Sequence, residues 1–205
     1  MKDFKELASN ESIEKTIAAL KANNIDAFVV ETENEAKEKV ISMLPKGAEV
    51  MNMTSVTLTQ VGLDKEIQES GNYNSVKAKL NKMDRATQGS EMQKLGAAPE
   101  YAVGSVHAVT ETGEVIIASN TGSQLPAYAY ASPHVIWVVG TQKIVADKPE
   151  GERRIYEYVL PLESVRLNKQ YSMTAGSFVS KLLIVNREFQ PGRVTVILVK
   201  KVLGF

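Results

Sequence analysis

The sequence predicts an α/β fold in which an open, mainly parallel β-sheet is flanked by helices. Short apolar segments suited to buried strands alternate with amphipathic segments suited to helices, as in βαβ units. Residues 135–139 are apolar throughout, as expected of a parallel strand that is covered on both faces. A chain of 205 residues can bury one core. We therefore expect a single domain over residues 1–205, in which residues 1–24 form an N-terminal helical extension.

The first hundred residues carry clear signals for helices and strands. Residues 3–23 have the apolar spacing of an amphipathic helix, which can be broken near Asn10. Residues 27–30 form a short apolar strand, and residues 49–53 form a second strand. Between these strands, Thr32 and Glu35 form a capping-box pattern that begins another helix. Two further helices are expected, over residues 57–70 and 75–96, and the second has a kink or a break around residues 85–91, where Gly89 lies in a polar run.

Residues 104–119 are expected to lie at the centre of the molecule. A strand over residues 102–109 contains small residues that let a neighbouring backbone or ligand come close. Residues 110–113 are expected to turn, because threonine and glycine suit turn dihedrals, and residues 115–118 form a second buried strand. Glu111 therefore lies at the corner between two strands, where its carboxylate can be held in a fixed direction.

The last third of the chain is expected to contain a helix and a C-terminal β-hairpin. Pro149 begins the helix, since proline is tolerated in the first helical turn. Residues 168–180 lack a clear period, so we expect a loop there. The hairpin joins residues 182–185 to residues 194–199 through the Pro-Gly pair at 191–192, which suits a turn.

The composition argues against several classes of function. Lys and Arg together number 24, as do Asp and Glu, which disfavours nucleic acid or an anionic membrane as the main partner because both select a basic surface. The chain has no cysteine, so it cannot itself supply a disulfide, a thiol nucleophile or thiolate ligands for zinc or iron–sulfur clusters. Its charged start is unlike a signal peptide, and no apolar run approaches the ~20 residues that span a bilayer. We therefore expect a cytoplasmic protein.

Other motifs limit the chemistry further. His107 and His134 are the two histidines of the sequence, so an intrinsic zinc site is not expected, whereas a carboxylate-held Mg²⁺ stays open. Walker A, Gly-x-Gly-x-x-Gly and Gly-x-Ser-x-Gly patterns are absent from the sequence. This argues against nucleotide hydrolysis, dinucleotide binding and a serine-hydrolase triad. The sequence assigns no cofactor.

A hydroxyl-rich loop follows the strand at residues 49–53. It carries Thr54, Ser55 and Thr57 at the entrance to a helix. Free backbone amides and the helix dipole favour an anion at such a position. The other interpretation is that these hydroxyls only cap the helix.

Glu111 is the candidate catalytic residue. We expect it to act as a nucleophile or an acid–base group that faces the loop of residues 54–57, although an ordinary solvated turn residue fits the pattern as well. A lone histidine such as His107 is more often a hydrogen-bonded core residue than a ligand, and Lys143 either reaches an anionic ligand or lies at the surface. The predicted ligand-binding residues are Thr54, Ser55, Thr57, Gly104, Ser105, His107, Thr112, Gly113, Asn120 and Lys143.

Several segments, in order along the chain, resemble the LUD-domain family. They are SVTL at 55–58, VGL at 61–63, AVTETG at 108–113, HVIWVV at 134–139, KIV at 143–145, PGRVTVILV at 191–199 and LGF at 203–205. The nearest type is the lactate-utilisation protein C (YkgG-like) group. The resemblance covers most of the chain from about residue 25.

The resemblance implies a fold like that of NagB, ribose-5-phosphate isomerase (RpiA) and the CoA transferases, which is an open α/β sheet with an added β portion. It also implies a role in bacterial L-lactate oxidation beside partner proteins that carry iron–sulfur clusters. In CoA transferases of this fold a glutamate attacks the acyl-CoA, and the resemblance places Glu111 at a comparable corner.

Three functions are consistent with the sequence. The first is a component of a lactate-oxidising system that binds a small anionic molecule and protein partners. The second is a stand-alone enzyme of the CoA-transferase or sugar-phosphate-isomerase type that uses Glu111, and the third is a structural subunit with a vestigial pocket. The family resemblance favours the first. The identity of the ligand and the formation of a homo-oligomer are left open.

Overall fold

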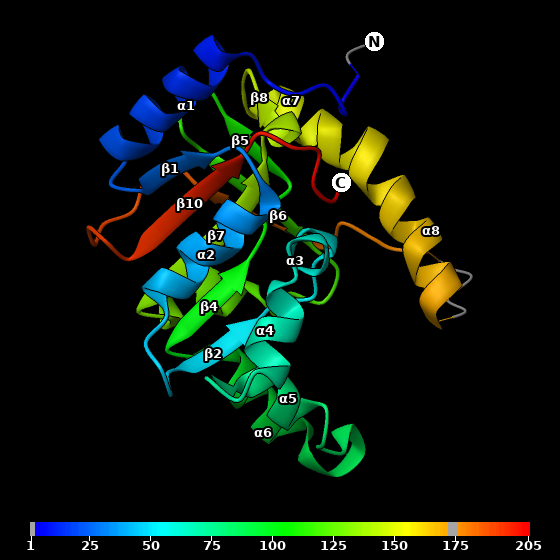
Figure 1. The fold of residues 1–205 in the computed structure, drawn as a ribbon. Coiled ribbons are helices and arrows are strands. Elements are labelled where there is room, and N and C mark those ends of the chain that lie inside the picture. Colours follow the sequence, from blue (N-terminus) through cyan, green and yellow to red (C-terminus); the bar gives the residue numbers. More distant parts are fainter. Residues whose placement is uncertain (1–2, 172–175) are drawn as a thin grey trace.

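The computed structural model describes residues 3–171 and 176–205, and their strands form two sheets (Figure 1). The larger sheet has six strands in the order β1-β10-β7-β4-β2-β3, and its pairings are parallel. This confirms the predicted open parallel sheet. Its strands are β1 (Asp26–Val30), β2 (Glu49–Asn52), β3 (Asn74–Ser75), β4 (Tyr101–Gly104), β7 (His134–Gly140) and β10 (Val194–Val199).

The two faces of the larger sheet are buried in separate apolar clusters. Along β7, Val135 and Trp137 belong to one cluster, whereas Ile136 and Val138 belong to the other, because successive side chains of a strand point to opposite faces. One cluster includes residues of α1 and the smaller sheet, and the other includes residues of α2, α3 and α4. These helices are α1 (Asn10–Ala22), α2 (Glu33–Met43), α3 (Val56–Val61) and α4 (Leu63–Glu69).

The smaller sheet has the strand order β8-β5-β6-β9. Within it, β5 and β6 are antiparallel and are joined by the predicted turn, in which Gly113 adopts a φ of +87° that favours glycine. The strands are β5 (Ala108–Thr110), β6 (Val115–Ser119), β8 (Ile144–Val145) and β9 (Lys181–Val185).

The remaining helices lie at two ends of the molecule. The segments α5 (Val76–Leu80) and α6 (Arg85–Ala97) follow β3, while α7 (Lys148–Arg154), η3 (Ile155–Val159) and α8 (Leu160–Tyr171) form one continuous run. The last of these extends away from the sheet (Figure 1). Proline lies in the first turn of α7, as expected from the sequence. Within the described residues, every helix is too short or too polar to cross a bilayer.

The predicted strand at residues 102–109 is wrong in one respect. The chain forms two strands there, since β4 ends at Gly104 in the larger sheet and β5 begins at Ala108 in the smaller one. Between them, the side chain of Lys143 donates hydrogen bonds to Ser105 Oγ and to the Val106 carbonyl. The chain passes from the larger sheet to the smaller one at these residues.

The predicted C-terminal hairpin is also corrected. Both strands exist, but β9 pairs with β6 in the smaller sheet, whereas β10 lies between β1 and β7 in the larger one. All residues of β10 are buried, which suits a central parallel strand. Because both edges of β10 are already paired, it cannot also pair with β9.

Two predicted helices are each divided. The helix expected over residues 57–70 is α3 followed by α4, because Gly62 between them adopts a left-handed φ of +75°. The helix expected over residues 75–96 is α5 followed by α6. The kink expected around residues 85–91 is confirmed at Gln88, whose φ and ψ are not helical.

The bounds of two other segments differ from expectation. The first helix begins at Asn10, where the Ser9 hydroxyl accepts from the Ser12 amide, rather than at residue 3. The loop expected over residues 168–180 is helical at its start, because α8 continues to Tyr171. Residues 172–175 of that segment lie outside the described residues.

Gly104→Ala tests how tightly the core packs around Tyr128. A Cβ at this position would lie 2.9 Å from Cζ of Tyr128 and would collide with its hydroxyl oxygen. Because over-packing a dense core costs about 1–3 kcal/mol, Gly104→Ala should lower Tm by several degrees. Differential scanning calorimetry measures this shift. Gly89→Ala is the matched control, since nothing lies within 4 Å of its new methyl group, and an equal loss in both variants would contradict the prediction.

Candidate functional site

The carboxyl ends of β2, β4, β7 and β10 lead into a cleft of about 960 Å³. In an open parallel sheet, ligands bind in such a crevice outside the carboxyl ends of the strands. The walls of the cleft come from the turns that follow these strands, from the end of β6, and from α5, α6 and α8. Segments that are far apart in the sequence therefore meet here.

Lys143 ties three of these segments together. Lys143 is 2% exposed and is the last residue of η2 (Thr141–Lys143), the short helix after β7. The Nζ donates to Thr57 Oγ1 at 3.2 Å, to Ser105 Oγ at 3.2 Å and to the Val106 carbonyl at 3.1 Å. A single amine thus joins the start of α3, the segment between the two sheets and the end of β7.

The surroundings of Lys143 favour its neutral form. Its hydrogen-bond partners are two hydroxyls and a carbonyl, and within residues 3–171 and 176–205 no carboxylate forms an ion pair with it. Burial first, and the positive charge of Arg154 second, lower the pKa of the Lys143 amine well below its ordinary value. A lysine without a charged partner in a cleft is a candidate for binding or chemistry.

Arg154 is the source of that second positive charge. Its side chain is fully buried, and Nη1 donates to the His107 carbonyl at 2.6 Å. The other two guanidinium nitrogens have no hydrogen-bond partner among the described residues, and the group lies 5.2 Å from the Tyr158 ring centroid. Burial lowers the pKa of Arg154 to about 10, so it stays charged at neutral pH.

His107 presents a neutral imidazole to the cleft. Its Nδ1 accepts a hydrogen bond from the Ala118 amide at 3.1 Å, so in the neutral ring the hydrogen lies on Nε2. Burial, followed by the charges of Lys143 and Arg154, lowers the pKa of His107 to about 3. The ring is therefore a hydrogen-bond donor, rather than a cation, at neutral pH.

The turn at residues 54–57 anchors two lysines. Ser55 caps α3 by accepting from the Leu58 amide at 3.4 Å, so the capping interpretation holds for this hydroxyl. Thr57 is buried and accepts from Lys143, whereas Thr54 Oγ1 accepts from Lys77 Nζ at 3.0 Å. Burial also lowers the pKa of Lys77.

The rest of the cleft wall adds further positive charge. Arg85 lies in the lining, as does Arg166, which binds both carboxylate oxygens of Glu163 at 2.7 Å. Glu163 is the one carboxylate side chain in the lining formed by the described residues. The wall therefore carries more cationic than anionic groups.

Most of the predicted binding residues line this cleft. The residues are Thr54, Ser55, Thr57, Ser105, His107, Asn120 and Lys143. Gly104 lies behind the wall, where it makes room for Tyr128. Thr112 and Gly113 lie elsewhere, since their carbonyls accept from Asn23 Nδ2 of the segment after α1 at 3.2 and 3.3 Å.

Glu111 is not part of the cleft lining. Its Oε1 accepts from the Ser12 hydroxyl at 2.7 Å, and its Oε2 forms an ion pair with Lys15 at 2.8 Å. Both partners belong to α1. The expected convergence of Glu111 with the loop of residues 54–57 is therefore wrong, because the antiparallel hairpin carries its turn to α1 and away from the carboxyl ends of the parallel strands.

The sequence interpretation missed three cations of the wall. Lys77, Arg85 and Arg166 lie on helices, where such residues are usually solvated. No local pattern separates them from other exposed lysines and arginines. Among the described side chains, no cluster of three or more His, Asp or Glu residues could hold a metal ion.

The pKa of His107 predicts how stability depends on pH. The unfolded chain binds a proton at His107 near pH 6.5, whereas the folded chain does so only near pH 3. Between these values the unfolded state holds more protons, so the free energy of unfolding should fall as pH falls. His107→Asn preserves an acceptor for the Ala118 amide but cannot titrate.

Denaturant titrations between pH 7 and 4 measure this effect. The wild-type protein should lose stability more steeply than the His107→Asn variant as pH falls. Parallel stability curves for the two proteins would contradict the assigned neutral state.

Comparison with solved structures gives a similar fold. A DUF162 family protein from Deinococcus radiodurans is similar over 95% of this chain and 99% of its own, with a TM-score of 0.58 and 14% identity. The eIF2B beta protein from Chaetomium thermophilum is similar over 58% of this chain and 44% of its own, with a TM-score of 0.40 and 13% identity. At these identities the first similarity supports the fold alone. The comparison with curated proteins gave no match.

Sequence comparison with protein families is more specific. The LUD domain matches residues 13–199, a range that includes both sheets and most of the residues that line the cleft. Since this match spans most of the chain, the protein belongs to the LUD domain family, which is linked to lactate utilisation.

Proposed function

We propose that this chain is a component of an L-lactate oxidation system and that its cleft binds a small anionic molecule. One observation carries the proposal: Lys77 lies half-buried in the cleft wall, and within the described residues no carboxylate forms an ion pair with it. Buried or half-buried cations without a counter-ion are costly. An anionic ligand would supply the missing charge.

The geometry favours a compact anion with several acceptor atoms. Lys77 is partly buried beside Thr54, and the cleft wall also carries the Arg85 guanidinium. A carboxylate or phosphate accepts several charge-assisted hydrogen bonds from such groups. His107 adds a neutral donor, which suits a hydroxyl or carbonyl oxygen next to the anionic group.

The lactate-utilisation C type and the iron–sulfur partner proteins belong to the same proposal. They rest on the family resemblance of segments such as AVTETG at 108–113 and on the membership of the LUD domain family. A small carboxylate such as L-lactate or pyruvate is the ligand class that connects this family link to the cationic cleft.

The alternative is a stand-alone enzyme of the CoA-transferase or sugar-phosphate-isomerase type that uses Glu111. It has less support, because both oxygens of Glu111 are engaged by α1 and its side chain is outside the cleft lining. An attacking carboxylate must approach the reacting carbonyl of the substrate closely.

Lys77→Met tests the cationic wall. Loss of a charge-assisted hydrogen bond costs about 1.5–3 kcal/mol, so Kd for a bound carboxylate or for inorganic phosphate should rise about tenfold or more. Isothermal titration calorimetry with L-lactate, pyruvate and inorganic phosphate measures the change.

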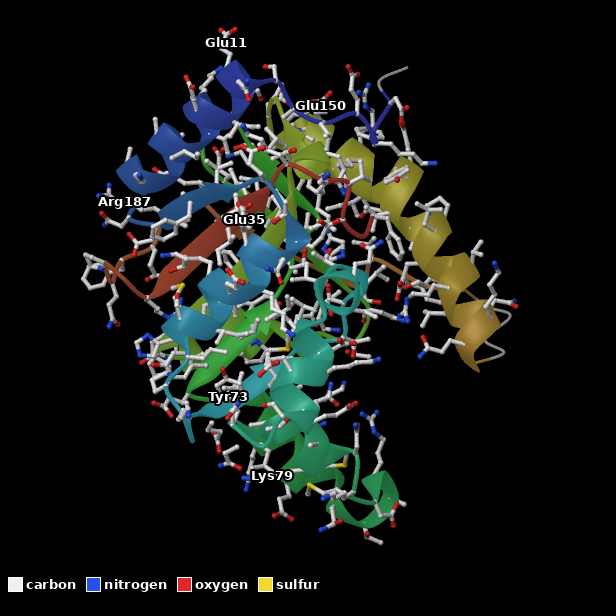
Figure 2. The ribbon with its side chains drawn as sticks, viewed as in Figure 1. Glu11, Glu35, Tyr73, Lys79, Glu150 and Arg187 are labelled. Carbon is white, nitrogen blue, oxygen red and sulfur yellow. The ribbon has the colours of Figure 1, made fainter. Side chains whose placement is uncertain are left out.

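Lys79→Met is the matched control, because Lys79 projects from the same helix into solvent (Figure 2). Equal weakening by both variants would contradict the proposed subsite, and absence of binding by wild-type protein would contradict the proposed function.

Glu111→Gln separates the two functions. It removes the ion pair with Lys15, which is exposed and screened by solvent, so Tm should fall slightly while Kd for the anions stays within twofold. The same titrations and a thermal scan measure both quantities. Loss of anion binding in a folded variant would favour the alternative enzyme. Loss of a measured CoA-transfer or isomerase activity would do the same.

A further inference from the structure

We propose that Lys143 is a nucleophilic amine that condenses with the carbonyl carbon of a small 2-oxo acid in the cleft and forms an imine. This inference rests on the proposed function, since the cationic wall must first hold the carboxylate of the ligand. It goes further because it assigns a covalent reaction to one residue and names the class of compound that reacts.

Hydrogen bonds fix the position of the Lys143 amine at the cleft wall. Three hydrogen bonds from Nζ to Thr57, Ser105 and the Val106 carbonyl fix its position, and the side chain belongs to the lining of the cleft. A lysine with a purely structural role in a protein interior usually pairs with a carboxylate. Among the described residues, Lys143 has hydroxyl and carbonyl partners instead.

Charged and titratable groups around Lys143 favour the free amine. Arg154, from α7, repels a second positive charge, and His107, from the segment between the sheets, is itself neutral. The partner from α3 is the hydroxyl of Thr57. Gly204, from the segment after β10, lies near the Lys143 amine. The three donated hydrogen bonds describe the ammonium form. Because burial lowers the pKa of the Lys143 amine, the proton that faces the Ser105 hydroxyl is readily lost, and this loss leaves the nitrogen lone pair that attack requires.

The position of the second lysine orients the ligand. Lys77 is bound to Thr54 at one end of the 54–57 turn, and Lys143 is bound to Thr57 at the other. A 2-oxo acid carries its carboxylate and its carbonyl on adjacent carbons. In the proposed complex the carboxylate binds on the Lys77 side of the turn, and the carbonyl carbon lies on the Lys143 side.

The reaction balances without a cofactor. The Nζ lone pair forms a C–N bond with the carbonyl carbon, and the amine loses a proton while the carbonyl oxygen gains one. The resulting carbinolamine then loses its hydroxyl group together with the remaining N–H proton as water, and the nitrogen electron pair forms the C=N bond. His107, as a neutral donor at Nε2, would stabilise the developing negative charge on the carbonyl oxygen. L-Lactate has a hydroxyl in place of the carbonyl, so it can bind but cannot condense.

Borohydride trapping tests this proposal. The full-length protein is incubated with pyruvate and sodium borohydride, which reduces an imine to a stable secondary amine, and the labelled peptide is located by mass spectrometry. We expect a single major adduct on Lys143. Labelling should fall when excess L-lactate competes for the cleft, and L-lactate alone should give no adduct.

Two variants sharpen the test. Lys143→Arg keeps a long side chain with N–H donors but removes the nucleophilic amine, so trapping should fall to background. In the Lys79→Met variant, Lys143 should be labelled as it is in the wild-type protein. If Lys143→Arg does not fold, competition by L-lactate in the wild-type protein still decides the matter. Adducts spread over exposed lysines and insensitive to L-lactate would overturn the proposal.

Calorimetry with pyruvate distinguishes failure of the imine proposal from failure of the proposed function. Binding of pyruvate without an adduct on Lys143 would overturn the imine and leave the anion site in place. If pyruvate, L-lactate and phosphate all failed to bind, both proposals would be wrong.

Discussion

The position of β10 in the middle of the six-stranded sheet constrains the rest of the structure. Its residues are buried and it pairs with β1 on one side and β7 on the other. The tail that follows is thereby brought to the cleft, where the Leu203 carbonyl accepts from Thr57 at 3.3 Å and from Gln142 at 2.8 Å. The Gly204 amide donates to Gln60 at 2.6 Å. The same strand therefore completes both the apolar core and one wall of the site.

Local sequence signals predicted the elements of the fold better than their pairing. The apolar run of β7 and the cap at Thr32 depend on residues next to one another in the chain, and both are present in the structure. Strand pairing depends on distant residues. The Pro-Gly turn at 191–192 suggested a hairpin, but burial of every β10 residue required two parallel neighbours from elsewhere. Likewise, the chain leaves the larger sheet after Gly104, where distant residues such as Lys143 contact Ser105 and Val106.

The candidate site was predictable where it follows directly from strand ends. The hydroxyls of the 54–57 turn and Lys143 come just after β2 and β7, and the carboxyl ends of parallel strands share one edge of the sheet. Glu111 belongs to an antiparallel hairpin of the other sheet, so this rule does not place it, and its carboxylate pairs with α1 instead. Lys77 enters the cleft from a helix whose orientation is a tertiary property. The polarity of its sequence could not reveal this.

The central place of a late strand also affects how the protein is made. β1 is synthesised early, yet Asp26 to Val30 find their neighbours at Thr195 to Val199, and such long-range pairing slows folding. Until the ribosome has released this last strand, β1 lacks that neighbour and β7 keeps one edge unpaired. Unprotected strand edges invite intermolecular association. A nascent chain that has not yet reached β10 therefore carries an incomplete sheet, and the six-stranded order is completed only when residues 194–199 have been synthesised.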